Sequence, residues 1–564
     1  MKHQEKIIIY SLLPRLWGND TQQLIPSGSM QHNGVGKMAD LSSEDLDYIR
    51  SLGCNYVWYI GLLEHATKTS FAHEGIPTDH PAIVKGEAGS PYAIRDYYDI
   101  APSLAEVVSE RMQEFEALVE RSHRAGLRVM IDFVPNHVAR TYSSDQAPRG
   151  VQDLGQGDDP GLAFSPTNCF YYLPGQRLEL PQEAQQSSIP YEEMPARATG
   201  NDCFSAHPSI NDWFETVKLN YGIDYQGSGQ LSCESIPTTW HRMLEILRFW
   251  AAKGVDGFRC DMAEMVPEAF WAWALSALKA DYPDLIFLAE IYQNHRYAAY
   301  LEAGFDFLYD KVGLYDGLRS IAMGQASAST FTAARDAVGA MQPRMCYFLE
   351  NHDEQRFASD FFCPEGKAWL PSLAATTLSG PNPYLHYFGG ELGERGMDAE
   401  GFSGRDGRTT IFDYWALDKV QRLRHGGFGP ALLTDQELEQ LTETQLLLGS
   451  IAQHPLVLEG GYHGLNYCNE ASPEYDSHRV LSFARYRDGE LLLVVSSFAS
   501  EARELSLHLP KSVLEHMGID VGKPMLRQDL LFGGSAIMAL TPLAPLRLSL
   551  GAYDTLIWHF IPLS

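Results

Sequence analysis

The stretch KGVDGFRCDMAEMV (residues 253–266) combines a strand-like apolar pattern with two charges that a buried strand normally avoids. Phe258 and Cys260 are apolar and fit a strand in a sheet. Residues two apart on a strand point to the same face, so Arg259 and Asp261 would be directed to one place. A strand that presents a guanidinium and a carboxylate side by side indicates either a structural ion pair or a functional site.

The segments around this stretch alternate between strand-like and helix-like patterns. Strand candidates at 6–13, 54–63 and 127–134 enclose helix candidates at 41–53 and 103–126. Strand–helix–strand units of this kind are typical of a parallel sheet. The rhythm resumes around the quoted stretch and gives about eight strand candidates in all, which predicts an α/β fold of the (β/α)8 TIM-barrel type.

Two regions depart from this rhythm. Residues 139–230 are rich in Gly, Pro, Gln, Asn and Asp without a clear period, and a structureless loop of that length is uncommon in a compact domain. We therefore expect a small domain inserted after the third strand. In the tail, short alternating strands with turn signals predict an antiparallel β-sandwich. The predicted domains are a barrel formed by 1–138 and 231–455, an inserted domain at 139–230, and a C-terminal β-sandwich at 456–564.

The composition restricts the classes of partner. The formal net charge of −29 argues against a nucleic-acid or anionic-membrane partner, because phosphates attract Lys and Arg. No apolar run is long enough to span a membrane, and the cysteines lack the spacing of a zinc site. The apolar run at 7–13 has no small-residue cleavage site after it, so we expect a cytoplasmic protein. The sequence carries no signal for the oligomeric state.

Acidic residues lie at the ends of several predicted strands. In a barrel of this type the active site is at the C-terminal ends of the strands. Asp261 ends the quoted strand, Glu290 ends IFLAE, and Asp353 ends YFLENHD. The first two are one βα repeat of roughly thirty residues apart, and the third follows about two repeats later. The spacing therefore predicts that three carboxylates converge on one mouth of the barrel.

Three carboxylates accompanied by an arginine and histidines fit two chemistries, a divalent metal site or glycoside cleavage by a carboxylate pair. Arg259 disfavours a cation bound directly to Asp261. It would instead hold the pKa of Asp261 low, as an ionised nucleophile requires. Glu290 has apolar neighbours in sequence, which would raise its pKa and keep it protonated as a general acid. The alternative is that each of these groups is structural.

Four segments in this order resemble conserved segments of the α-amylase family of retaining glycoside hydrolases. They are DFVPNH (132–137), GFRCDMA (257–263), FLAEI (287–291) and FLENHD (348–353). The stretch GSPYAIRDYYDI (89–100) is similar to the segment that supplies a tyrosine platform in that family. The resemblance covers nearly the whole chain and implies the same barrel with an insertion after strand 3.

The resemblance also implies a role for each matching residue. Asp261 corresponds to the nucleophile, Glu290 to the acid/base, and Asp353 to the third acid, which binds the distorted sugar. Four further residues would bind the sugar at the cleavage point or hold the nucleophile: Tyr92, His137, Arg259 and His352.

Many members of the family bind a structural calcium between the barrel and the inserted domain, although the chemistry itself requires no cofactor. Asn136 corresponds to one calcium ligand. Lys218 falls where an aspartate ligand is expected, and an ammonium group cannot ligate calcium. The sequence therefore argues against calcium at this place, while Asn136 stays a candidate ligand.

The resemblance implies an enzyme that hydrolyses α-1,4-glucosidic bonds in starch, glycogen or maltodextrins by double displacement. A 4-α-glucanotransferase would share every catalytic residue and differ only in how well its acceptor site excludes water. A non-catalytic glycan-binding relative is a third reading, although such proteins usually lack one of the acids. The expected partner in each case is an α-glucan.

Overall fold

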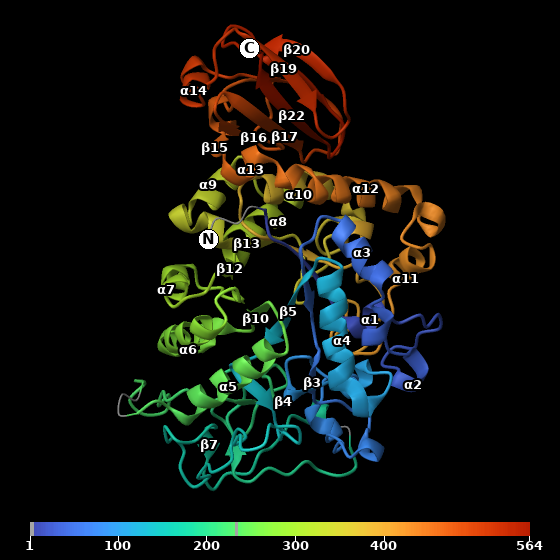
Figure 1. Ribbon diagram of the computed structural model, residues 1–564, viewed down its shortest axis with the longest axis vertical. Helices are drawn as coiled ribbons and strands as arrows, with labels where there is room; N and C mark the ends of the chain where they lie inside the picture. The colour runs from blue at the N-terminus through green and yellow to red at the C-terminus, as the bar shows by residue number, and fades with distance from the viewer. Residues whose placement is uncertain (1–4, 186, 232–234, 564) are drawn as a thin grey trace.

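The computed structural model describes residues 5–185, 187–231 and 235–563. Eight parallel strands close into a barrel in the middle of the molecule (Figure 1), in the order β1-β14-β13-β12-β11-β10-β5-β2. This confirms the predicted (β/α)8 barrel. The strands are β1 (Ile8–Leu12), β2 (Tyr56–Tyr59), β5 (Arg128–Phe133), β10 (Gly257–Cys260), β11 (Ile286–Ala289), β12 (Phe307–Tyr309), β13 (Met345–Phe348) and β14 (Tyr384–Tyr387).

Helices surround the barrel, and longer ones such as α4, α5 and α6 bury an apolar face. Ser42 starts α3 through a capping box, in which its hydroxyl accepts the amide of Asp45 while the Asp45 carboxylate accepts the amide of Ser42. The helices in chain order are α1 (Pro14–Trp17), α2 (Met30–Asn33), α3 (Ser43–Ser51), α4 (Arg111–Arg124), α5 (Thr238–Ala252), α6 (Glu268–Asp281), α7 (Tyr297–Glu302), α8 (Asp316–Ala322), α9 (Thr330–Asp336), α10 (Trp369–Leu378), α11 (Asp418–His425), α12 (Asp435–Gly449) and α13 (Pro455–Glu459). Among the described residues, none of these helices combines the length and apolarity that crossing a membrane requires.

A hairpin of two antiparallel strands follows β2. It consists of β3 (Leu63–His65) and β4 (Ile94–Ile100), with register shifts on both sides of Glu64. The sequence pattern had predicted one strand over 54–63, whereas the chain turns after β2 and starts β3 at Leu63. The hairpin lies beside the inserted region at the bottom of Figure 1.

The insertion follows β5, as predicted, and carries little regular structure. Its strands are β6 (His137–Ala139), β7 (Tyr172–Leu173), β8 (Ala196–Arg197) and β9 (Thr216–Lys218). Strand β6 pairs antiparallel with β9, which places His137 opposite Lys218. A small apolar core that includes Leu173 and Phe214 stabilises the insertion.

The C-terminal region is a sandwich of two antiparallel sheets, at the top of Figure 1. Strand β17 connects the sandwich to the barrel. Successive side chains of a strand point to opposite faces, so one face of β17 can pack inside the sandwich and the other against the barrel. Leu491, Leu493 and Val495 pack between the two sheets, whereas Leu492 and Val494 join the core of the barrel. The elements are β15 (Gly461–Gly464), β16 (Val480–Arg487), β17 (Glu490–Ser497), β22 (Thr555–Pro562), β19 (Pro524–Asp529) and β20 (Ser535–Ala539) in one sheet, β18 (Arg503–Leu507) and β21 (Leu546–Leu550) in the other, and the helix α14 (Lys511–His516).

Candidate active site

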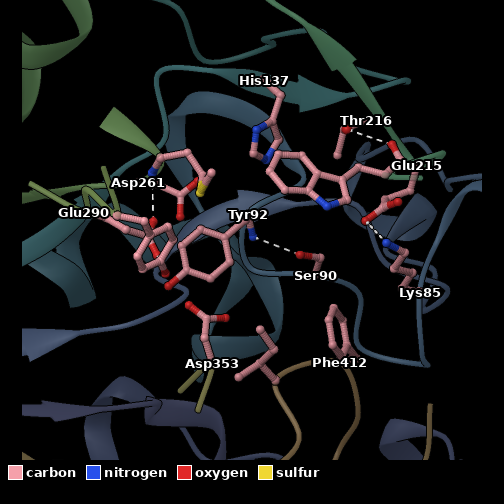
Figure 2. Close-up of a pocket in the computed structure, with 14 residues that line it drawn as sticks. Lys85, Ser90, Tyr92, His137, Glu215, Thr216, Asp261, Glu290, Asp353 and Phe412 are labelled. Carbon is pink, nitrogen blue, oxygen red and sulfur yellow. Dashed lines mark hydrogen bonds and ion pairs between the residues drawn. The ribbon is translucent and has the colours of Figure 1, made fainter. Parts of the chain in front are cut away.

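A cavity of about 360 Å³ opens at the C-terminal ends of the barrel strands. Figure 2 shows five of the predicted site residues around it, Tyr92, His137, Asp261, Glu290 and Asp353. The two other predicted residues, Arg259 and His352, lie directly beneath this surface and contact its members. The structure therefore brings all seven predicted residues together.

Arg259 is the centre of the charge arrangement. Its side chain is fully buried, and its Nη1 lies 2.6 Å from Asp261 Oδ1. Its Nη2 lies 2.9 Å from Glu290 Oε2, an ion-pair distance without the angle of a hydrogen bond. Asp132 and Asp353 are farther away, at 3.8 Å and 3.9 Å. One guanidinium thus compensates four carboxylates, two of them in direct contact.

Strand register explains why this cation lies here. Arg259 is paired across the sheet with Asp132 of β5, and Asp261 lies two residues further along on the same face. The guanidinium is also stacked among three aromatic rings, 5.3 Å from the ring centroid of Trp58, 5.5 Å from that of Tyr92 and 5.6 Å from that of Tyr309. These rings shield the cation from water and favour its charge through their π faces.

The ionisation of the carboxylates differs from the sequence-based prediction. Burial raises the pKa of Asp261 well above its ordinary value, and Glu290 adds to this effect, while Arg259 acts in the opposite direction without reversing it. Burial also disfavours ionised Asp353, but His352 and Arg259 outweigh it and lower the pKa of Asp353 to about 2. The prediction of a low pKa for Asp261 is wrong, because the sequence revealed neither how deeply the carboxylate is buried nor how closely Glu290 approaches it.

Glu290 has polar surroundings, so the predicted apolar setting is also wrong. Its Oε2 accepts the backbone N–H of Met262 at 2.8 Å, and its Oε1 accepts the hydroxyl of Tyr292. Tyr292 lies two residues after Glu290 in the sequence. This spacing was the available signal for Tyr292, a residue that the sequence reasoning missed.

The backbone of Met262 links Asp261, which precedes it in the chain, to Glu290, which accepts its N–H. Met262 follows Asp261 directly and has φ 42° and ψ 42°, a left-handed conformation that residues other than glycine rarely adopt. This turn directs the N–H of Met262 to Glu290. Strained conformations of this kind persist where the surrounding structure holds them, often at active sites.

Tyr92 lines the cavity, and His352 supports it from beneath. The Tyr92 hydroxyl lies 2.6 Å from His352 Nε2, and the two rings are stacked with centroids 5.3 Å apart. His352 Nε2 is also 2.9 Å from Asp353 Oδ2. Burial raises the pKa of Tyr92 well above its ordinary value, and Asp132 adds to this effect, so the phenol stays protonated.

His137 also lines the cavity (Figure 2) and packs next to Trp213 of the inserted region, with ring centroids 5.1 Å apart. Burial, with Lys218 and Lys85 nearby, lowers the pKa of His137 to about 3. The imidazole is therefore neutral at physiological pH and able to both donate and accept a hydrogen bond.

Beyond Trp213 the cavity is bounded by an ion pair and an aromatic ring. Lys85 Nζ lies 2.9 Å from Glu215 Oε1, and Phe412 also lines the cavity (Figure 2). None of these three residues was predicted. They come from loops and from the insertion, where no periodic pattern marks a side chain as part of the site.

The residues at the expected calcium position do not fit a bound cation. Lys218 is buried, and its Nζ lies 2.6 Å from Asn136 Oδ1 and 2.6 Å from Asp202 Oδ1. The ammonium group thus already takes the oxygen of Asn136 that would face a metal. A second positive charge at this place would be repelled by Lys218.

Comparisons with known proteins agree with this geometry. Residues 28–422 match the family model described as alpha amylase, catalytic domain. The chain is 23% identical to the alpha-amylase MalA of Haloarcula japonica over 473 residues, which cover 83% of this chain and 53% of that protein. It is 26% identical to the trehalose synthase/amylase TreS of Mycolicibacterium smegmatis over 274 residues, or 46% of this chain and 37% of that protein. The chain thus spans about half the length, or less, of these curated relatives.

A solved structure shares the whole fold. The maltogenic alpha-amylase AmyB of Thermotoga neapolitana superposes with a TM-score of 0.62 at 20% identity, and the match covers 100% of both chains. At 20% identity this similarity shows a shared fold and does not by itself show a shared activity.

Proposed function

Because the chain belongs to the α-amylase family of glycoside hydrolases, we propose that it cleaves α-1,4-glucosidic bonds in starch, glycogen or maltodextrins with retention of configuration. The observation that carries the proposal is the contact of one buried guanidinium, Arg259, with both Asp261 and Glu290. Two carboxylates on one guanidinium are compatible with the separation of about 5–5.5 Å that retaining glycosidases use.

In the first step of the proposed reaction, Asp261 Oδ attacks the anomeric carbon and forms a covalent glycosyl–enzyme ester. The bond between that carbon and the leaving oxygen breaks, and Glu290 donates its proton to the oxygen. In the second step Glu290 takes a proton from water, whose oxygen attacks the anomeric carbon and releases Asp261. Each step displaces from the opposite face, so the α configuration is restored.

The proposed roles require one proton among the three acids. Asp353, with its pKa of about 2, stays ionised and favours the positive charge that develops on the sugar. The raised pKa of Asp261 supports one retained proton in the mouth. We place this proton on Glu290 when substrate is bound, because the sugar's anomeric carbon then faces Asp261 and the leaving oxygen faces Glu290.

The walls of the cavity suit a sugar ring. Tyr92 and Trp213 offer aromatic faces to the apolar C–H surface of a glucose unit. The neutral His137 and the ionised Asp353 offer donors and acceptors to its hydroxyls. The mixture of flat apolar faces and few polar groups is what a glucose ring requires.

Azide rescue with an α-maltosyl fluoride tests the two carboxylate roles separately, because fluoride leaves without a proton donor. In Asp261→Ala, azide enters from the face that the nucleophile has vacated and gives the β-maltosyl azide. In Glu290→Ala, Asp261 still forms the ester, and azide then attacks it to give the α-maltosyl azide. Proton NMR distinguishes the two anomers. Exchanged anomers would reverse the assignment, and no rescue in either variant would contradict it.

Incubation of the wild-type protein with maltoheptaose tests the substrate and the acceptor, with Asp261→Asn as the inactive control. Shorter products that are initially α-anomers support hydrolysis with retention. Products longer than maltoheptaose would instead assign a 4-α-glucanotransferase. An unchanged substrate in both samples, with starch also untouched, would contradict the proposed substrate class.

A further inference from the structure

Four carboxylates meet at a second place, outside the cavity. Glu64 of β3, Asp96 and Asp99 of β4, and Asp145 at the start of the insertion each offer one oxygen, and these oxygens all lie within 4.8 Å of one another. The first three are buried, and Asp145 is exposed. None of the four takes part in the proposed reaction.

The spacing of the four oxygens fits a calcium ion. Calcium binds carboxylate oxygens at about 2.3–2.6 Å, so two ligands on opposite sides of the ion are about 4.6–5.2 Å apart. The upper limit of 4.8 Å within the cluster therefore allows all four oxygens to contact one ion. An all-oxygen, carboxylate-rich set is typical of hard cations and not of zinc or copper.

One of the four carboxylates also carries a buried oxygen without a partner. The side chain of Glu64 is only 2% exposed, and its Oε1 binds Arg95 Nη1 at 2.8 Å. Within the described part of the chain, no donor reaches Oε2 of Glu64. An ionised oxygen left unsatisfied in the interior is costly, and native proteins rarely keep one without a bound group.

The nearby cations do not balance the cluster. Arg95 is shared between Glu64 and Asp79, and Arg111 binds Asp99. Asp96 accepts hydrogen bonds from backbone N–H groups, those of Tyr98, Asp145 and Gln146.

We propose that Glu64, Asp96, Asp99 and Asp145 bind one Ca²⁺. The ion joins the β3–β4 hairpin to the first residues of the insertion, two parts of the chain that lie next to each other in Figure 1. Strand β4 begins two residues after Tyr92, so the ion also anchors the segment that carries one wall of the cavity. This place is distinct from that of Asn136, where Lys218 supplies the positive charge.

Calcium binding to the full-length protein tests the proposal without reference to activity. After chelation and gel filtration, the protein is titrated with CaCl₂ by calorimetry and with Tb³⁺ by luminescence sensitised by nearby tyrosines. One ion per chain is expected, together with a higher melting temperature in Ca²⁺. Asp145→Ala removes an exposed ligand with little risk to folding, and we expect it to weaken binding by about 10- to 100-fold or more. Asp284→Ala, an exposed aspartate elsewhere on the barrel, is the matched control and should bind Ca²⁺ normally.

Three results would overturn the proposal. One is an absence of Ca²⁺ and Tb³⁺ binding up to about 1 mM, the weak end of protein calcium sites. Another is equal binding by Asp145→Ala and Asp284→Ala. The third is a Glu64→Gln variant that folds and binds Ca²⁺ with unchanged affinity, since it lacks the charge assigned to the ion.

Discussion

Replacing Arg259 by methionine removes the guanidinium that lies within ion-pair distance of four carboxylates. Methionine has a similar length and no charge, so the volume of the site is largely kept. Removing one partner of a buried ion pair costs about 3–5 kcal/mol, because the remaining charge is left uncompensated. An unfolding entropy of about 2.1 cal/mol/K per residue over residues 28–422 converts this loss into a fall of about 4–6 °C in the melting temperature of the barrel.

The sign of the pH dependence follows from the same carboxylates. The pKa of Asp353 is held at about 2, below the ordinary value of about 3.9. The stabilisation of this group is therefore present at neutral pH and lost as the pH falls through about 2. Burial raises the pKa of Asp132 to about 6, against the effect of Arg259, so Asp132 takes up a proton between neutral and mildly acidic pH. The difference in melting temperature between the wild type and Arg259→Met should therefore become smaller as the pH is lowered, because fewer ionised carboxylates are left without the cation.

Differential scanning calorimetry of the barrel transition at about pH 7 and about pH 4.5 measures both effects. Arg248→Met is the matched control, because Arg248 pairs with Asp281 at 3.1 Å on the surface, with both side chains about half exposed. Exposed pairs contribute about 0–1 kcal/mol, so the control should lose about 1 °C or less. The reasoning is refuted if the two variants melt at the same temperature at neutral pH. It is also refuted if the melting temperature of Arg259→Met lies as far below that of the wild type at about pH 4.5 as at about pH 7.

Three further changes have defined outcomes. Lys218→Met leaves the buried Oδ1 of Asn136 without its ammonium donor and should cost about 1–3 kcal/mol; an unchanged melting temperature would contradict this. Tyr292→Phe removes the hydroxyl that binds Glu290 and should lower kcat/KM on maltoheptaose by about tenfold, but not on α-maltosyl fluoride, which leaves without a proton; equal losses on both substrates would refute a positioning role. Burial and two neighbouring carboxylates raise the pKa of Glu443 from 4.5 to about 7, which costs stability once the pH exceeds 4.5. Glu443→Gln should therefore raise the melting temperature at about pH 8, by a gain of at most about 3 kcal/mol, and leave it unchanged at about pH 4; an equal change at both would contradict this.

The sequence was sufficient to predict the barrel, because the patterns that indicate its strands and helices are local. Each strand and helix shows its own period, and the order of the elements restricts the topology to few alternatives. The same regularity located Asp261, Glu290 and Asp353, since each acid follows the C-terminal end of a strand and all strand ends of a barrel meet at one mouth. The β3–β4 hairpin was missed because β3 has only three residues and its pairing with β4 is interrupted by register shifts on both sides of Glu64.

The electrostatics of the site depended on distances across the chain. The expected low pKa of Asp261 rested on its neighbour Arg259, whereas the strength of burial and the approach of Glu290 are set by the packing of several strands. The apolar surroundings expected for Glu290 were inferred from sequence neighbours, but its contacts come from the turn at Met262 and from Tyr292.

By itself the sequence determined the class of fold, the place of the insertion and the identity of the acids at the mouth of the barrel. Only the tertiary structure decided that Lys218 bonds Asn136 across 82 residues, and that Glu64 and Asp145 meet the two aspartates of β4. The physical reason is that periodicity encodes which face of an element is buried, whereas charge–charge energies vary with distances that the sequence does not contain.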